Sequence, residues 1–317
     1  MLEFEIIIQG LYRPNQLTIQ YDPNSHISVA PQTQIWMDEF WQEQLQQARL
    51  QNKRLFDAPL FRYVDAQSST DQSLHLTLGD TSYKEYVTTR TPLFAQNRAR
   101  QELANPLAVC SAIETSDGYI LLDRRQGVDV YAGRYHVIGG FFERSLDTST
   151  SLHNTSVSPD TSNLSYPTYP SNSSSASDPS NPTYPSLATY PSKASTPSIQ
   201  PDPFAAMRRE IREETGIQSD DIREQYCLGL VYDLATPHAE MCFLTLLDIP
   251  LEEVQRRQPE DDEIKQLIPL HVTAESLRAF ILQHHGNISA TGEPNLLFYG
   301  AWKLGTSWLN EIIEEIQ

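Results

Sequence analysis

Cysteine, basic residues and long apolar runs are scarce in this chain of 317 residues. Its three cysteines, Cys110, Cys227 and Cys242, show no Cys-x-x-Cys spacing, so neither a zinc site nor a disulfide framework is indicated. The 23 Lys and Arg residues are outnumbered by 41 Asp and Glu residues, and a net charge of -18 disfavours binding to nucleic acid. No apolar run approaches the roughly 18 residues that span a bilayer. The N-terminus lacks the basic start of a signal peptide. We therefore expect a soluble, cytoplasmic protein without membrane or nucleic-acid partners.

A tract rich in Ser, Thr, Tyr and Pro runs from about residue 144 to residue 201. It contains almost no aliphatic residues and cannot bury enough apolar area to offset the entropy lost on ordering. Its many X-Pro bonds also oppose a helix. The sequence predicts a disordered insertion here.

The blocks beside this tract complement each other. Strands are predicted at 118–125 and 134–140 before it, and a charged helix followed by strands at 227–234 and 240–249 after it. This order indicates one α/β unit that the insertion interrupts.

The first 100 residues form a further region. Its predicted elements are strands at 4–8, 56–65 and 74–79 and an amphipathic helix at 32–51, whose Ile35, Trp36, Phe40 and Trp41 we assign to the core. These strands either extend the later sheet or form a separate lobe. Helices at 274–285 and 301–316 are expected to cover a sheet face.

The charged helix contains "RREIREETGI", Arg208 to Ile217. Asp202 is a suitable N-cap, Pro203 suits the first helical position, and Gly216 suits a left-handed end. At 100° per residue, Phe204, Met207 and Ile211 share one stripe, and Glu210, Glu213 and Glu214 fall within an arc of roughly 100° beside it. The acidic face therefore borders the packed face.

Two interpretations of the three glutamates stay open on spacing alone. Glutamates at i, i+3 and i+4 repel one another, and a divalent cation such as Mg²⁺, which takes oxygen ligands, removes that penalty. The alternative is a solvated face with Arg-Glu pairs.

The segment "REIREETGI", Arg209 to Ile217, resembles the second half of the Nudix box, a loop and helix that hold metal-bound diphosphates. The first half resembles the Gly139-Gly140 pair in "YHVIGGFFER", with Glu143 where many members have an additional acid. The insertion separates the two halves.

One box residue is missing. The middle glutamate of the box should stand at Leu146 when positions are counted forward from Gly140, or at Pro201 when they are counted back from Arg209. In the family this acid commonly pairs with the arginine, so Asp202 or Asp147 substitutes for it, or Arg209 has another partner.

The phrases "LFDAPLFRYVD", "LHLTLGDTSYKEYVTT" and "ANPLAV" upstream are similar to the Nudix subgroup that includes the vertebrate UDP-glucose and UDP-galactose hydrolase and its plant relatives. The resemblance implies a Nudix α/β/α sandwich with a mixed sheet. The implied parts are an N-terminal α+β extension (1–100), a first Nudix part (101–143), the insertion (144–201) and a second Nudix part (202–317).

The implied reaction is hydrolysis of a nucleoside diphosphate sugar, UDP-glucose or UDP-galactose, to UMP and sugar 1-phosphate with Mg²⁺ or Mn²⁺. The implied metal ligands are Gly140, Glu210, Glu213 and Glu214, and Arg209 braces the loop. Glu260 in "PEDDEI" is the favoured candidate for the general base, with Glu263 as the second.

The sequence does not settle the role of three further residues, Glu240, His136 and His238. Glu240 is either a ligand or substrate contact, or a surface acid on an edge strand. His136 and His238 are expected near the cleft, where a lone histidine is usually structural. For the whole chain, the alternatives are a Nudix hydrolase of another substrate, such as ADP-ribose, and a non-catalytic Nudix scaffold with a disordered interaction tract. The oligomeric state is not predicted.

Overall fold

The computed structural model describes residues 2–96, 98–126, 130–150, 199–260 and 267–316. The predicted disordered insertion therefore lies outside the described residues from 151 to 198. Its two ends differ from the prediction, because β9 (Thr148–Thr150) and β10 (Ile199–Pro201) form a two-stranded sheet. Residues 2–149 and 200–316, where described, belong to one compact unit.

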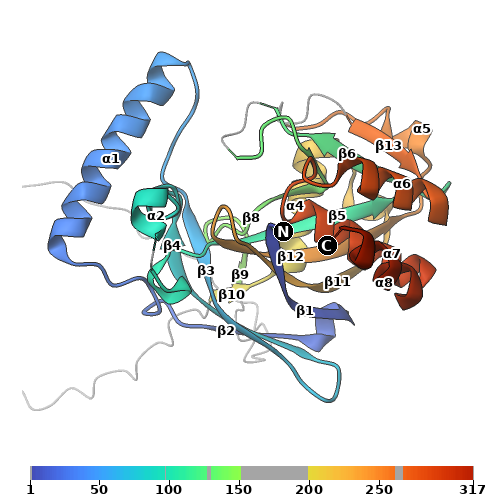
Figure 1. The fold of residues 1–317 in the computed structure, drawn as a ribbon, viewed down its shortest axis with the longest axis horizontal. Helices are drawn as coiled ribbons and strands as arrows, with labels where there is room; N and C mark the ends of the chain where they lie inside the picture. The colour runs from blue at the N-terminus through green and yellow to red at the C-terminus, as the bar shows by residue number, and fades with distance from the viewer. Residues whose placement is uncertain (1, 97, 127–129, 151–198, 261–266, 317) are drawn as a thin grey trace, which may run out of the picture. The chain divides into compact units, whose positions relative to one another are not determined.

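A mixed sheet forms the centre of this unit (Figure 1). Strands β12 and β5 run parallel, and the other neighbours in the sheet are antiparallel. The main order is β1 (Phe4–Tyr12), β11 (Ile222–Asp233), β12 (His238–Leu247), β5 (Leu107–Glu114), β6 (Tyr119–Arg124) and β13 (Leu267–His271). The predicted strand at 134–140 divides into β7 (Tyr135–His136), which pairs with β6, and β8 (Ile138–Phe141), which pairs with β5.

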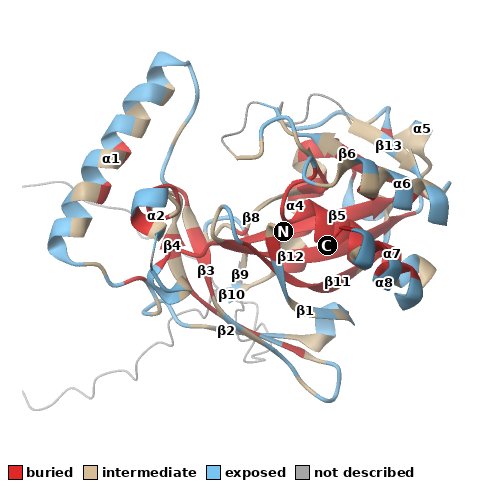
Figure 2. Cartoon of the chain, in the orientation of Figure 1, coloured by how far each residue is buried: buried red, intermediate tan, exposed pale blue. Residues whose placement is uncertain are grey.

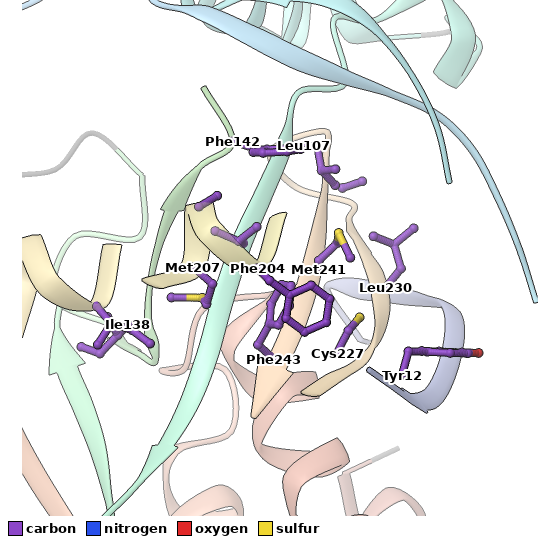
Figure 3. Close-up of a cluster of buried hydrophobic side chains, with 14 of the residues drawn as sticks. Tyr12, Leu107, Ile138, Phe142, Phe204, Met207, Cys227, Leu230, Met241 and Phe243 are labelled. Carbon is purple, nitrogen blue, oxygen red and sulfur yellow. The ribbon is translucent and has the colours of Figure 1, made fainter. Parts of the chain in front are cut away.

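Helices cover both faces of this sheet. On β12, Met241 and Phe243 pack in one apolar cluster with Phe204 and Met207 of α4 (Pro203–Thr215), as Figure 3 shows. The alternate residue Cys242 belongs to a second cluster, formed with α6 (Ala274–His284), α7 (Gly292–Leu304) and α8 (Thr306–Ile316). Since successive strand residues point to opposite faces, the two clusters confirm the predicted three-layer α/β/α arrangement.

The sequence left open whether the N-terminal strands extend the central sheet or form a separate lobe, and the structure shows both arrangements. Strand β1 extends the central sheet, whereas β2 (Leu17–Tyr21), β4 (Leu74–Ser82) and β3 (Pro59–Ser68) form a separate three-stranded sheet. The Phe61 N–H donates to the Phe142 carbonyl at 3.0 Å and joins this small sheet to the end of β8. The short elements are α2 (Tyr83–Thr89), α3 (Pro92–Ala95), α5 (Leu251–Val254), η1 (Pro14–Gln16), η2 (Arg100–Glu102) and η3 (Ser219–Asp221).

Helix α1 (Pro31–Leu50) is more exposed than its aromatic residues suggested (Figure 2). Trp41 is buried as expected, together with Met37, but Ile35 is 52% exposed, so its assignment to the core was wrong. The stripe that packs is therefore narrower than predicted. None of the described helices, α1 included, is long and apolar enough to cross a membrane.

Candidate functional site

Helix α4 has the ends that its sequence predicts. The Asp202 carboxylate accepts the N–H of Ala205 at 2.9 Å, Pro203 occupies the first helical position, and Gly216 ends the helix with φ of 74°. Phe204, Met207 and Ile211 are completely or almost completely buried. Burying three side chains of this size contributes about 1.5–3 kcal/mol each, which fixes the rotation of the helix and hence the direction of its acidic face.

The glycine pair and the helix meet despite the long insertion between them. Gly139 and Gly140 lie on β8, opposite Cys110 and Val109 of β5. A Cβ atom built on Gly140 would lie 2.6 Å from the Cδ atom and both carboxylate oxygens of Glu210. Only glycine leaves room for this carboxylate against the backbone of β8.

Asp147 is the partner of Arg209. Its two carboxylate oxygens accept from Nε at 2.8 Å and Nη2 at 2.9 Å of the guanidinium, and one of them also accepts the Glu143 N–H at 2.8 Å. Both side chains are largely buried, with 2% of Asp147 and 12% of Arg209 exposed. Asp147 thus provides the acid absent from Leu146 and Pro201, and Asp202 is occupied as the cap of α4.

Arg209 also joins two of the glutamates. Its Nη1 atom lies 2.9 Å from Glu210 Oε1 and 2.9 Å from Glu213 Oε2, and its Nη2 donates to the Phe141 carbonyl at 3.2 Å. Burial opposes charge on Arg209, but the hydrogen bonds to Asp147 and the negative charges around it outweigh burial and raise the pKa of Arg209. Arg209 is therefore positively charged in the folded protein.

The oxygen donors on β8 and α4 suit a hard divalent cation. The Gly140 backbone lies against the Glu210 carboxylate, and Glu213 is one helical turn away from Glu210. Among the described residues, however, no three His, Cys, Asp or Glu side chains form a group that could hold a metal ion as they stand. Arg209 explains this, because its guanidinium lies between Glu210 and Glu213.

The remaining predicted site residues are Glu214, Glu260 and Glu263. Glu214 is 6% exposed and is not among the described residues that line the cavity beside Glu210 and Glu213. Glu260 is exposed; its N–H donates to the Glu213 carbonyl at 2.8 Å, and its carboxylate accepts from Arg212 Nε at 3.0 Å. Glu263 lies outside the described residues.

A cavity of about 750 Å³ opens beside the glutamates. Its wall combines acids of β12, α4 and the segment after β8 with cations and aromatic residues of the N-terminal region, the loop after β6 and the end of β8. The acids are Glu143, Glu210, Glu213 and Glu240, the cations include Lys53, Arg54, Arg90 and Arg125, and the aromatic residues are Phe56, Tyr83, Tyr86, Tyr131 and Phe141. Such a mixed wall suits a ligand that has both charged and uncharged polar groups.

Glu240 and two histidines form a buried cluster in the cavity wall. Glu240 is 3% exposed on the central strand β12, so the interpretation as a surface acid on an edge strand was wrong. Its Oε1 lies 3.8 Å from His136 Nε2, and its Oε2 lies 3.5 Å from His238 Nε2. The signal in the sequence was the polar pair at 238 and 240, two positions on one face of an otherwise apolar strand.

The two histidines carry different charges. Burial, followed by the positive charge of Arg125, lowers the pKa of His136 to about 3, so its ring is neutral. Burial also opposes charge on His238, but Tyr86, the hydrogen bond to Glu240 and the charge of Asp233 outweigh it and raise the pKa of His238 to about 10. Burial likewise opposes charge on Glu240, and His238 and His136 overcome it and lower the pKa of Glu240 to about 2. His238 and Glu240 are thus a buried ion pair.

Comparison with known proteins gives weak likenesses. No protein-family model matches the chain, and no curated protein matches it. A bifunctional NMN adenylyltransferase/ADP-ribose pyrophosphatase from Francisella tularensis is similar over 69% of this chain, with 12% identity and a TM-score of 0.35. The chain spans 46% of that protein's length.

Two other solved structures are similar over 63% of this chain. The MutT protein from Methanosarcina mazei Go1 is covered over 99% of its length, with 17% identity and a TM-score of 0.30. A NUDIX hydrolase from Nitrosomonas europaea is covered over 90% of its length, with 14% identity and a TM-score of 0.30. Likenesses at this level support no conclusion about activity.

Proposed function

We propose that this protein is a Nudix hydrolase that cleaves the diphosphate bond of a nucleoside diphosphate sugar, with Mg²⁺ or Mn²⁺ as cofactor. The substrate is UDP-glucose or UDP-galactose, and the products are UMP and sugar 1-phosphate. The substrate assignment rests on the resemblance of the upstream phrases to the UDP-sugar subgroup.

The observation that supports the proposal is the contact between Gly140 and Glu210. The two halves of the Nudix-like motif are far apart in the sequence, yet the Glu210 carboxylate fills the space that a side chain at Gly140 would take. The pairing of Asp147 with Arg209 restores the arginine-acid contact that the missing middle glutamate would have provided. Gly140, Glu210 and Arg209 lie in the wall of a cavity large enough for a nucleotide sugar.

Each site residue has a defined part in the proposed reaction. Glu210, Glu213, Glu214 and the Gly140 carbonyl would hold the divalent cation. When bound, that cation supplies positive charge against the phosphate oxygens and lowers the pKa of a coordinated water. Arg209 neutralises part of the acidic cluster before substrate arrives and ties the end of β8 to α4.

The cavity then holds the substrate in position for attack by water. Catalysis of phosphoryl transfer depends mainly on positioning and on charge stabilisation, so fixed side chains matter more than covalent chemistry. The cavity wall also contains Arg54, Arg90 and Arg125. Their positive charges offset the negative charges of the four acids and of the diphosphate.

We retain Glu260 as the proposed general base. Its backbone N–H donates to the Glu213 carbonyl, so Glu260 lies beside the C-terminal turn of α4. To act as a base, its carboxylate has to exchange Arg212 for the attacking water. Glu260→Gln tests the role: the acid limb of the pH profile of kcat should disappear, and a profile unchanged in shape would refute it.

The substrate proposal is tested with a panel of UDP-, ADP- and GDP-sugars, with and without Mg²⁺. We expect UMP and sugar 1-phosphate from UDP-glucose or UDP-galactose only when the cation is present. Turnover of ADP-ribose, a dinucleoside polyphosphate or a damaged nucleotide in preference to these would support the alternative substrate. No turnover of any nucleotide would favour a non-catalytic scaffold.

A further inference from the structure

The hydrogen-bond partners of His136 fix which ring nitrogen holds its proton. His136 Nδ1 lies 2.5 Å from Ser289 Oγ, and the same oxygen accepts the N–H of Gly292 at 3.0 Å. The Gly292 amide can only donate, and the serine hydroxyl hydrogen has no acceptor other than Nδ1 among the described residues. An unprotonated Nε2 would also turn its lone pair toward the Glu240 carboxylate, so the serine donates to Nδ1. The neutral imidazole then carries its proton on Nε2.

The Nε2–H group faces the Glu240 carboxylate without bonding to it. The separation from Oε1 is 3.8 Å, too long for a hydrogen bond, and no other described residue accepts from Nε2. Glu240 stays ionised beside His238, whose Nδ1 donates to the Thr236 carbonyl at 2.6 Å. A neutral donor and a charged acceptor therefore lie next to each other in the cavity wall.

Only some ligand groups can use both partners at once. A phosphate oxygen would be repelled by Glu240, a carbonyl oxygen cannot donate, and an ammonium group cannot accept from His136. A hydroxyl group can accept from Nε2 and donate to Oε1. Two hydrogen bonds of about 2.8 Å that meet at one oxygen at roughly a right angle span the observed separation.

We propose that His136 and Glu240 together bind one hydroxyl group of the substrate's sugar. This inference rests on the proposed function for the identity of the ligand, but not on the chemistry of cleavage. The subsite selects sugars that present a hydroxyl at one ring position and rejects those that lack it. His238 acts by holding Glu240 ionised and in place.

Equilibrium binding tests the subsite separately from hydrolysis. UDP-glucose and its 2-, 3-, 4- and 6-deoxy analogues are titrated calorimetrically into the unaltered protein without added divalent cation, so that no turnover occurs. We expect one analogue to bind roughly 30-fold more weakly than UDP-glucose, which corresponds to about 2 kcal/mol for a hydrogen bond to a charged group. In His136→Phe that penalty should fall to roughly tenfold or less, because the hydroxyl keeps its bond to Glu240 but loses the one from His136.

The unaltered protein alone can overturn the proposal, so it does not depend on the folding of a variant. Binding of all four deoxy analogues within about threefold of UDP-glucose would refute it, as would no binding of UDP-glucose. A penalty that keeps its full size in His136→Phe would also refute it. His75→Phe, at an exposed histidine outside the cavity wall, is the control and should keep the full penalty. Binding with the expected penalty but without hydrolysis after Mg²⁺ is added would refute the proposed reaction and leave the subsite standing.

Discussion

Removing the Asp147 carboxylate should destabilise the fold more than any change at an exposed ion pair. Asp147 makes two hydrogen bonds to the buried Arg209 guanidinium and a third to the Glu143 N–H. In Asp147→Ala, Arg209 loses the partner that faces its Nε atom and keeps Glu210, Glu213 and the Phe141 carbonyl.

The expected loss follows from burial and from the partners that remain. Breaking a buried ion pair by removing one member costs about 3–5 kcal/mol, and the surviving contacts of Arg209 favour the lower end. We expect Asp147→Ala to lower the free energy of unfolding by about 3 kcal/mol. Asp147→Asn keeps one acceptor oxygen and should lose about half as much.

Urea unfolding followed by circular dichroism measures this loss, and Asp248→Ala is the matched control. Asp248 pairs with Arg223 at 3.7 Å, and the two side chains are 60% and 51% exposed, so its loss should stay below about 0.5 kcal/mol. A cost below about 1 kcal/mol for Asp147→Ala would refute the role assigned to this pair.

Three further predictions concern the site. Gly140→Ala should lower kcat about a hundredfold with a small change in stability, because its Cβ would displace only the Glu210 carboxylate; unchanged turnover would contradict the contact. The Tyr86 hydroxyl is buried without a hydrogen-bond partner among the described residues, whereas the Tyr232 hydroxyl donates to Asn105. Tyr232→Phe should cost about 1 kcal/mol in the same urea assay, and Tyr86→Phe should cost less; a larger cost for Tyr86→Phe would contradict this. His238 has a folded pKa of about 10 against an ordinary 6.5, so its contribution is complete below pH 6.5 and declines as the pH rises toward 10. In His238→Gln the decline of unfolding free energy between pH 6.5 and about 9 should be shallower than in the unaltered protein; equal slopes would refute the assignment.

Local sequence rules predicted the parts of the site that depend on neighbouring residues. The cap at Asp202, the left-handed end at Gly216 and the buried stripe of α4 all follow from spacing within one helix. The acids of α4 border the packed face, as predicted, and Glu210 is buried there.

The contacts that sequence reasoning missed connect distant segments. The sequence left three possibilities for the partner of Arg209: Asp147, Asp202 or another residue. Only the fold, which places the residues between β8 and β9 beside α4, selects Asp147. The burial of Glu240 depends on β5, a strand absent from the predicted elements, which pairs with β12 and makes it a central strand. The assignment of Ile35 to the core was wrong because α1 packs mainly against α2, which leaves the Ile35 side of the helix exposed.

The central claim is tested most directly by the release of UMP from UDP-glucose in the presence of Mg²⁺. The rate is compared between the unaltered protein, Glu213→Gln and Glu275→Gln. Glu275 is an exposed acid on α6 outside the cavity wall and serves as the control. The account predicts that Glu213→Gln lowers the rate at least about a hundredfold, as expected when a main metal ligand is neutralised, and that Glu275→Gln leaves it unchanged. Equal rates for all three proteins, or no release of UMP by the unaltered protein, would contradict it.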